Sequence, residues 1–149
     1  MVGHSAYRAR DAVWCYGRWN VADTSTPALG KLVDTVSSQW GNIIGWDFNT
    51  QIVYNEGGGA IFHEMELVAL TGNVLSGVNP TIWTQHSVDG ETWSGERWIS
   101  AGRIGERAKR LTWRGCGKMQ DRRIQRFRGT SDAHVAVARL EARLEALSS

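Results

Sequence analysis

Short stretches of β-favouring residues alternate with glycine-marked turns over the first two-thirds of the chain. Glycines recur every several residues from Gly17 to Gly105, and the segments between them are rich in Val, Ile, Thr, Trp and Phe. This spacing is typical of an all-β sandwich or barrel. The pattern predicts strands at Val13–Val21, Lys31–Val36, Asn42–Phe48, Gln51–Asn55, Ile61–Leu70, Thr81–Ser87, Arg97–Ala101, Arg110–Arg114 and Arg123–Arg128.

The clearest of these strands is Ile61–Leu70, in which apolar and charged residues alternate. Met65 and Leu67 fall on one face, whereas Glu64 and Glu66 point to the other. Such alternation predicts a strand with one buried and one solvated face. Two carboxylates on one face could serve acid–base chemistry, but an ordinary solvated strand face is the simpler interpretation.

The segment Arg123–Arg128 allows two interpretations. Ile124 and Phe127 are three residues apart, which fits a helical turn as well as a strand. The pattern alone does not decide between them.

The C-terminal segment has a different periodicity. Its apolar residues are spaced +3, +4 and +3, which places them on one stripe of a helix. They are Val137, Leu140, Leu144 and Leu147. Ala, Arg and Glu fill the other positions, and Ser131 or Asp132 could cap the start. We therefore predict a short C-terminal helix that docks on the sheet or pairs with a neighbouring subunit.

Composition narrows the class of protein. The chain has 149 residues, which suits one domain or two small ones, and no run of about 18 apolar residues that could span a membrane as a helix. Two cysteines, Cys15 and Cys116, cannot build a disulfide scaffold or a zinc site. The histidines form no short-spaced pair, and no phosphate-binding loop occurs. We expect no enzymatic activity, no metal and no cofactor.

The charge is concentrated in one segment. The net charge is only +2, but Arg97–Arg128 holds eleven basic and two acidic residues, a net of +9. Most of these basic residues are arginines, which bind phosphate or carboxylate groups through two hydrogen bonds. This predicts an anionic partner, with a solvated sheet face of ordinary ion pairs as the alternative. The candidate interface to a partner protein or to DNA consists of Arg103, Arg107, Arg110, Arg114, Arg122, Arg123, Arg126 and Arg128.

The segment 87–94, Ser-Val-Asp-Gly-Glu-Thr-Trp-Ser, resembles the Asp-box turn of sialidases and other β-propellers. That turn reads Ser-x-Asp-x-Gly-x-Thr-Trp, so one residue is missing here before the glycine. Its members here are Ser87, Asp89, Gly90, Thr92 and Trp93. The turn is structural in the families that carry it. Together with the eight tryptophans, most of which we expect in the core, it leaves a carbohydrate-binding or glycosidase-related β domain as an alternative function.

The turn also belongs to a longer series of motifs. Residues 62–67 read Phe-His-Glu-Met-Glu-Leu, 102–106 read Gly-Arg-Ile-Gly-Glu, 110–114 read Arg-Leu-Thr-Trp-Arg, 121–123 read Asp-Arg-Arg, and 131–132 read Ser-Asp. In this order, and most strongly from residue 60 to 132, they resemble the C-terminal part of the packaged-DNA stabilisation proteins of short-tailed bacteriophages. Departures are Gly115 and Cys116 within a Trp-Arg-Arg-Leu-Gly motif, Ala133 in place of a proline, and the much greater length of family members.

The resemblance implies a non-enzymatic structural virion protein of the phage head–tail junction that helps to retain packaged DNA and to attach tail components. It implies a homo-oligomeric ring, with the portal adaptor, the tail needle or tailspike and packaged DNA as partners. The location would be the virion, and the host cytoplasm during assembly.

The resemblance also refines the expected fold. We predict a mostly-β protein of antiparallel sandwich-like or propeller-derived sheets with a short C-terminal helix. Residues 1–56 would form a blade-like β segment and residues 60–149 a C-terminal β domain, unless the two are one continuous domain. The family suggests a strand at Val135–Leu140, where the leucine spacing suggests a helix.

Overall fold

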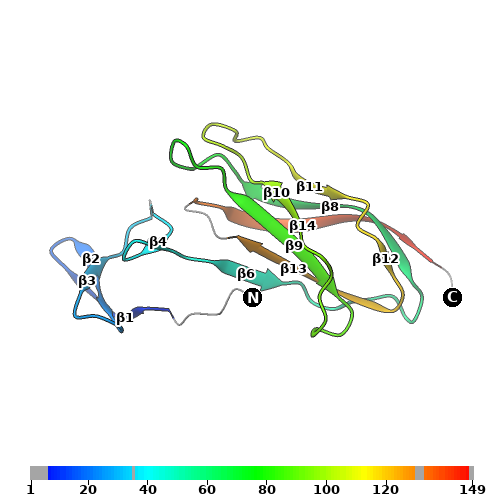
Figure 1. Ribbon diagram of the computed structural model, residues 1–149, viewed down its shortest axis with the longest axis horizontal. Coiled ribbons are helices and arrows are strands. Elements are labelled where there is room, and N and C mark those ends of the chain that lie inside the picture. The colour runs from blue at the N-terminus through cyan, green and yellow to red at the C-terminus, as the bar shows by residue number, and fades with distance from the viewer. Residues whose placement is uncertain (1–6, 35, 130–132, 148–149) are drawn as a thin grey trace.

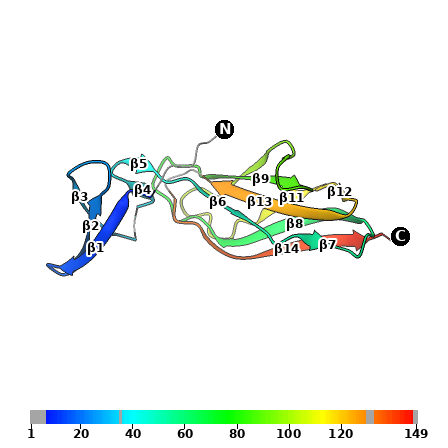
Figure 2. The same ribbon diagram turned by 90° about the horizontal axis from the view of Figure 1, so that it is seen from below.

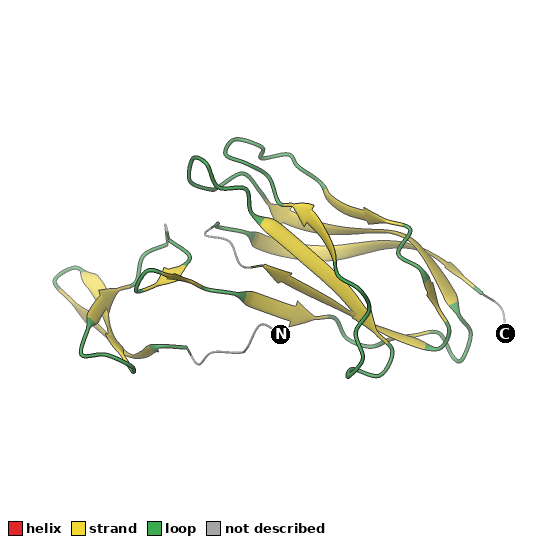
Figure 3. Cartoon of the chain, viewed as in Figure 1, coloured by secondary structure: helices red, strands yellow, loops and turns green. Residues whose placement is uncertain are grey.

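The computed structural model describes residues 7–34, 36–129 and 133–147, which contain strands, turns and loops but no helix (Figure 1, Figure 3). The strands are β1 (Ala9–Cys15), β2 (Arg18–Asp23), β3 (Leu29–Lys31), β4 (Ser38–Gln39), β5 (Asn42–Ile43), β6 (Trp46–Asn49), β7 (Val53–Tyr54), β8 (Ala60–Leu70), β9 (Thr81–Ser87), β10 (Arg97–Ser100), β11 (Leu111–Arg114), β12 (Lys118–Met119), β13 (Arg122–Gly129) and β14 (Ala136–Ala146). Every strand pair in the described part is antiparallel, so the predicted antiparallel β class is confirmed. No helix in these ranges could cross a membrane.

Two sheets pack face to face into a β-sandwich, on the right of Figure 1. The first has the order β10-β9-β13-β6, and β7 also pairs with β13. In the second, β14 pairs along one edge of β8, while β11 and β12 pair along the other. The core between the sheets includes Phe62, Met65, Leu67, Ile82, Leu111, Trp113, Met119 and Phe127.

Strand β13 alternates between the interior and the outer face along its whole length. Arg123, Gln125 and Phe127 are buried, whereas Ile124 is half-buried on the opposite side. Ile124 and Phe127 therefore lie on different faces of the sheet. The segment is a strand and not a helical turn.

Strand β8 confirms the predicted alternation and adds a bulge. Arg143 of β14 pairs with Glu64, but the next residue, Leu144, pairs with Phe62, so His63 is an extra residue on β8. A bulge of this kind shifts the side-chain alternation by one position. Phe62 and Met65, three residues apart, are both buried for this reason.

The predicted C-terminal helix is wrong, because β14 forms an eleven-residue strand along β8 (Figure 2). From Ala138 to Ala146 every second residue is Ala or Leu, with Arg or Glu between them, so the segment has the period of a strand as well as a helical stripe. Pairing with β8 and packing of Leu140 against the core override the helix propensity of the residues. The proposed helix caps, Ser131 and Asp132, lie outside the described residues.

The N-terminal part forms a small sheet, β1-β2-β3, and a β4–β5 hairpin beside the sandwich (Figure 1). The predicted strand Val13–Val21 is in fact two strands, because Tyr16 and Gly17 turn the chain with φ of 54° and 68°. Two positive φ angles are the mark of a type I′ hairpin turn. The division into domains on either side of the three glycines at 57–59 stays a prediction. Strands β6 and β7 precede these glycines in the chain, but they pair with β13 of the sandwich.

The expectation that most tryptophans lie in the core is wrong. Trp113 is 2% exposed, but Trp98 is 65% exposed on β10. Trp14 and Trp19 are also exposed, on the β1–β2 hairpin, where their rings pack edge to face with centroids 5.5 Å apart. The other four tryptophans are half-buried.

Candidate functional site

The eight arginines of the candidate interface lie in four different places. Arg122, Arg126 and Arg128 are on the outer face of the first sheet, and Arg110 and Arg114 are on the outer face of the second. Arg103 and Arg107 are on the loop between β10 and β11, and Arg123 is inside the sandwich. The two outer faces point in opposite directions, so the arginines do not form one continuous patch.

On the outer face of the first sheet, each of two arginines is held by a carboxylate and a tryptophan. Arg126 Nη2 lies 2.9 Å from Asp47 Oδ2, and its guanidinium carbon lies 5.4 Å from the centroid of Trp93. The corresponding contacts of Arg128 are with Glu96 (Nη2–Oε2, 2.7 Å) and Trp83 (5.3 Å). These arginines already have counter-ions within the chain.

The outer face of the second sheet carries the carboxylates of β8. The guanidinium of Arg110 donates to both carboxylate oxygens of Glu66, from Nε to Oε1 (2.8 Å) and from Nη2 to Oε2. Arg114 Nε lies 3.0 Å from Glu64 Oε2. The hydrogen bonds from Arg110 hold the pKa of Glu66 below its ordinary value. Both carboxylates are therefore members of ion pairs on this face of the sheet.

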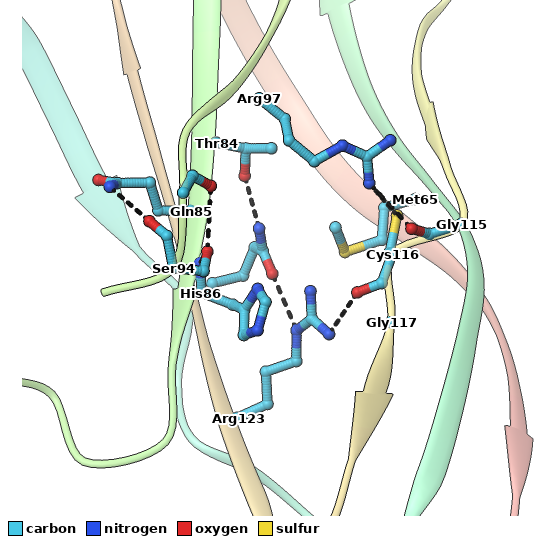
Figure 4. A pocket seen from close by; sticks show the side chains of 12 residues that line it. Met65, Thr84, Gln85, His86, Ser94, Arg97, Gly115, Cys116, Gly117 and Arg123 are labelled. Atoms are coloured by element: carbon cyan, nitrogen blue, oxygen red, sulfur yellow. Dashed lines mark hydrogen bonds between the residues drawn. The ribbon is translucent and has the colours of Figure 1, made fainter. Parts of the chain in front are cut away.

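The interior arginine lies beside a cavity of about 180 Å³ between the sheets (Figure 4). Arg123 is 2% exposed, and its Nε donates to Gln125 Oε1 (3.0 Å) while Nη1 donates to the carbonyl of Cys116 (2.7 Å). Its guanidinium carbon lies 4.6 Å from the centroid of Phe62. Gln125 Nε2 in turn donates to Thr84 Oγ1 (2.6 Å). Arg123 thus joins β13 to the β11–β12 loop, and it is not accessible to a partner, contrary to its place in the predicted interface.

No Asp or Glu occurs among the residues that line this cavity. Burial lowers the pKa of Arg123, and burial together with the charge of Arg123 lowers the pKa of His86. The thiol of Cys116 donates to the carbonyl of Trp113 (3.2 Å) rather than to a base. The hydrogen bonds of Thr84, Gln125 and Arg123 in Figure 4 form a polar seam that links the sheets. No cluster of His, Cys, Asp or Glu side chains in the described ranges could hold a metal ion.

The Asp-box-like turn follows β9 and is built around one carboxylate. Asp89 Oδ1 accepts hydrogen bonds from the backbone N–H of Thr92 (2.7 Å) and Glu91 (2.9 Å), and from the hydroxyl of Ser87 (2.8 Å). Ser87 Oγ accepts from the backbone N–H of Gly90 (2.8 Å). These bonds hold the pKa of Asp89 well below its ordinary value. These hydrogen bonds close the turn, and they occupy the carboxylate of Asp89 within it.

The depressed pKa of Asp89 predicts how stability depends on pH. Because the folded pKa is lower than the unfolded value of about 3.9, the stabilisation is fully present above that value and is lost as pH falls toward the folded pKa. We expect Asp89→Asn to unfold more easily than the wild type at pH 7, with the difference shrinking between pH 4 and pH 2. Urea denaturation at several pH values measures it, and a difference that stays constant over this range would contradict the role given to the carboxylate.

Comparison with known families identifies the sandwich. A family model described as bacteriophage P22 Gp10, beta-sandwich, matches residues 45–145. The match covers more than half of the chain. The chain belongs to this family. The P22 Gp10 match begins just before β6 and ends one residue before the end of β14, so it spans both packed sheets and leaves β1 to β5 outside. No curated protein matches the chain.

Membership in the P22 Gp10 family agrees with the resemblance noted from the sequence motifs at the level of a phage structural protein. The interior residues that sequence reasoning missed are Thr84 and Gln125. Their alternation along β9 and β13 predicts that they share a face with buried neighbours, but the pairing of these strands, which brings them together, has no local signal in the sequence.

Proposed function

We propose that this protein is a non-enzymatic structural component of the phage head–tail junction, which helps to retain packaged DNA and to attach tail components. The observation that carries the proposal is the match of residues 45–145 to the P22 Gp10 β-sandwich. The order of motifs from residue 62 to 132 supports the same role. The partners would be the portal adaptor, the tail needle or tailspike and other copies of this chain, in the virion and, during assembly, in the host cytoplasm.

The loop between β10 and β11 is the part of the arginine-rich segment best placed to meet an anionic partner. The loop is held against the end of β8, because Thr71 Oγ1 donates to the carbonyl of Glu106 (2.8 Å). Within the loop, Glu106 Oε2 accepts from the backbone N–H of Arg103 (2.7 Å). Gly72, with φ of 76°, lies so close that a Cβ there would be 2.8 Å from the backbone of Glu106. The exposed side chain of Arg107 has no partner in the described ranges.

A phage with an early stop codon in this gene tests the proposal. We expect particles that package DNA but lose it, so that electron microscopy shows empty heads without tail components and nuclease digests the released DNA. Complementation with the wild-type gene restores filled particles. Filled, infectious particles in the absence of the protein would overturn the proposal.

The loop arginines give a sharper test. We expect Arg103→Glu combined with Arg107→Glu to weaken association with an anionic partner at least tenfold, because each exchange turns attraction into repulsion. The exposed Arg10→Glu on β1 is the matched control and should leave association unchanged. If DNA is the partner, the affinity of the wild type for duplex DNA falls steeply with salt, and the slope of log affinity against log salt decreases by about two in the double variant. Equal behaviour of the double variant and Arg10→Glu would contradict the assignment of the loop.

A further inference from the structure

Strand β14 leaves one edge of the second sheet open. Within the described residues it pairs with β8 alone, over nearly the whole length of both strands, and it runs along the lower border of the sandwich in Figure 2. An edge strand of eleven residues is long, and it contains neither proline nor lysine, which commonly protect such edges. Its outer N–H and C=O groups are a template for another strand.

Most side chains of β14 are also exposed to solvent. Leu144 is 46% exposed and Val137 is 38% exposed, and both belong to apolar positions of the strand. The charged residues between them alternate in sign along the opposite face: Arg139, Glu141, Arg143 and Glu145. A partner strand would therefore meet an apolar row on one face and a row of alternating charge on the other.

The sequence of β14 is complementary to itself when two copies run antiparallel about Ala142. In that register Glu141 faces Arg143 of the second copy, and Arg139 faces its Glu145. On the other face Leu140 faces Leu144. Ala138 is a bulged residue, because Val137 pairs with Ala69 of β8 and Arg139 with the next residue, Val68, so the regular and self-complementary stretch runs from Arg139 to Glu145. Residues opposite one another in an antiparallel pair have Cβ atoms about 4.5–5.5 Å apart, so every charge meets its opposite and every apolar residue meets another.

Neighbouring registers lack this complementarity. Sliding one copy by two residues places Arg139 opposite Arg143 in one direction and Glu141 opposite Glu145 in the other. Sliding it by one residue sets the apolar face of one strand against the charged face of the other. The register centred on Ala142 is therefore specified against its nearest competitors.

We propose that β14 is a dimerisation strand, through which two copies of this chain join their second sheets edge to edge about a two-fold axis at Ala142. The contact is isologous, with the same residues contributed by both copies. It pairs two chains and cannot by itself close a larger ring, which needs a different, heterologous surface. The inference thus goes beyond the proposed virion role and does not depend on it.

Charge reversal on the strand tests the pairing. Glu141 lies opposite Glu66 of β8 and accepts a hydrogen bond from Arg139 of its own strand (2.6 Å), so Glu141→Arg removes one like-charge contact and one ion pair from the monomer. In the dimer it creates two Arg–Arg pairs. By sedimentation velocity we expect the wild type to be dimeric and Glu141→Arg to dissociate at least tenfold more readily, while its circular dichroism spectrum stays that of the folded wild type. The double variant Glu141→Arg/Arg143→Glu restores opposite charges in the same register and should restore the dimer.

Cysteine cross-linking tests the register itself. In a Cys15→Ser background, Ala142→Cys places two thiols on the two-fold axis, within the Cα separation that a disulfide allows. We expect mild oxidation to give a covalent dimer of Ala142→Cys. Arg139→Cys and Glu145→Cys should give none separately, but a covalent heterodimer when mixed. The buried Cys116 is present in all variants.

Each outcome decides for or against the dimer. A wild type that sediments as a monomer at all soluble concentrations overturns the proposal, and so does a dimer that Glu141→Arg leaves intact. A failure of the double variant to restore association, or cross-linking of Arg139→Cys alone, would assign the contact to another register or surface and would equally overturn it. The phage stop-codon experiment is independent of all these results.

Discussion

Phe127→Ala is expected to cost about 4 kcal/mol of the free energy of unfolding, which is the usual loss for removing a fully buried phenylalanine. Phe127 is 0% exposed and lies on β13, near the middle of the sandwich. Its ring stacks on Phe48 of β6 (5.4 Å between centroids) and packs at a tilt on Trp113 of β11 (5.5 Å). The side chain thus contacts both sheets, and its removal leaves a cavity that neither sheet can fill. Urea denaturation followed by tryptophan fluorescence measures the loss.

The matched control for Phe127 is an aromatic residue of the same sheet that is not between the sheets. Trp98 on β10 is 65% exposed and faces Trp83 across the β9–β10 pair. Trp98→Ala should cost less than about 1 kcal/mol, since it removes one cross-strand contact and no core packing. Similar losses for the two variants would mean that the core does not lie where Phe127 places it.

The strands that could be predicted are those whose alternation is strict. The predicted strand Thr81–Ser87 has the same limits as β9, and Ile61–Leu70 differs from β8 by one residue. Hairpins with unusual turns could not be predicted: Tyr16-Gly17 and Trp40-Gly41 take positive φ angles at a large aromatic residue, a position where Asn or Asp is the common choice. The predicted strand Val13–Val21 therefore joins β1 to β2, and β4, on the far side of the Trp40-Gly41 turn from β5, has no predicted counterpart.

The C-terminal segment could not be assigned from its own residues. The repeat Ala-Arg-Leu-Glu between Ala138 and Glu145 has apolar residues at helical spacing and at every second position, so both patterns fit. The conformation of the segment is decided by its pairing with the edge of β8, which is a feature of the folded sheet rather than of the segment itself. Tertiary pairing then outweighs helix propensities that differ by less than about 1 kcal/mol per residue.

The arginine-rich segment shows the same limit at the level of the candidate site. Composition could predict that the residues from Arg97 to Arg128 carry excess positive charge, but not on which surface each would lie. The alternation of β13 sends Arg126 outward and Arg123 inward, and the carboxylates that pair with the outer arginines come from strands far away in the sequence. Sequence distance to Asp47, for example, is 79 residues. Part of the positive charge of the segment is thus balanced by ion pairs with carboxylates outside it, which no local sequence pattern predicts: Asp47, Glu64, Glu66 and Glu96.

Arg123→Ala is the second substitution for which we expect a large effect, a loss of about 3 kcal/mol. The change leaves Gln125 Oε1 and the carbonyl of Cys116 without their donor, at about 1–3 kcal/mol for each buried group, and it empties the space over Phe62. An opposing effect reduces this loss. The wild type buries a guanidinium without a carboxylate partner, which is unfavourable and lowers the pKa of Arg123, and the alanine variant avoids this cost.

A comparison of two substitutions separates these opposing effects. Arg123→Met keeps most of the side-chain volume over Phe62 but cannot donate, so its loss, about 1–2 kcal/mol, reports the hydrogen bonds net of the relieved burial. The further loss in Arg123→Ala reports the cavity. Thiol labelling gives an independent readout, because Cys116 is 4% exposed beside this cavity and should react faster in Arg123→Ala than in Arg123→Met. If Arg123→Met proves as stable as the wild type while Arg123→Ala does not, Arg123 acts as packing material, and the polar seam between the sheets contributes nothing to stability.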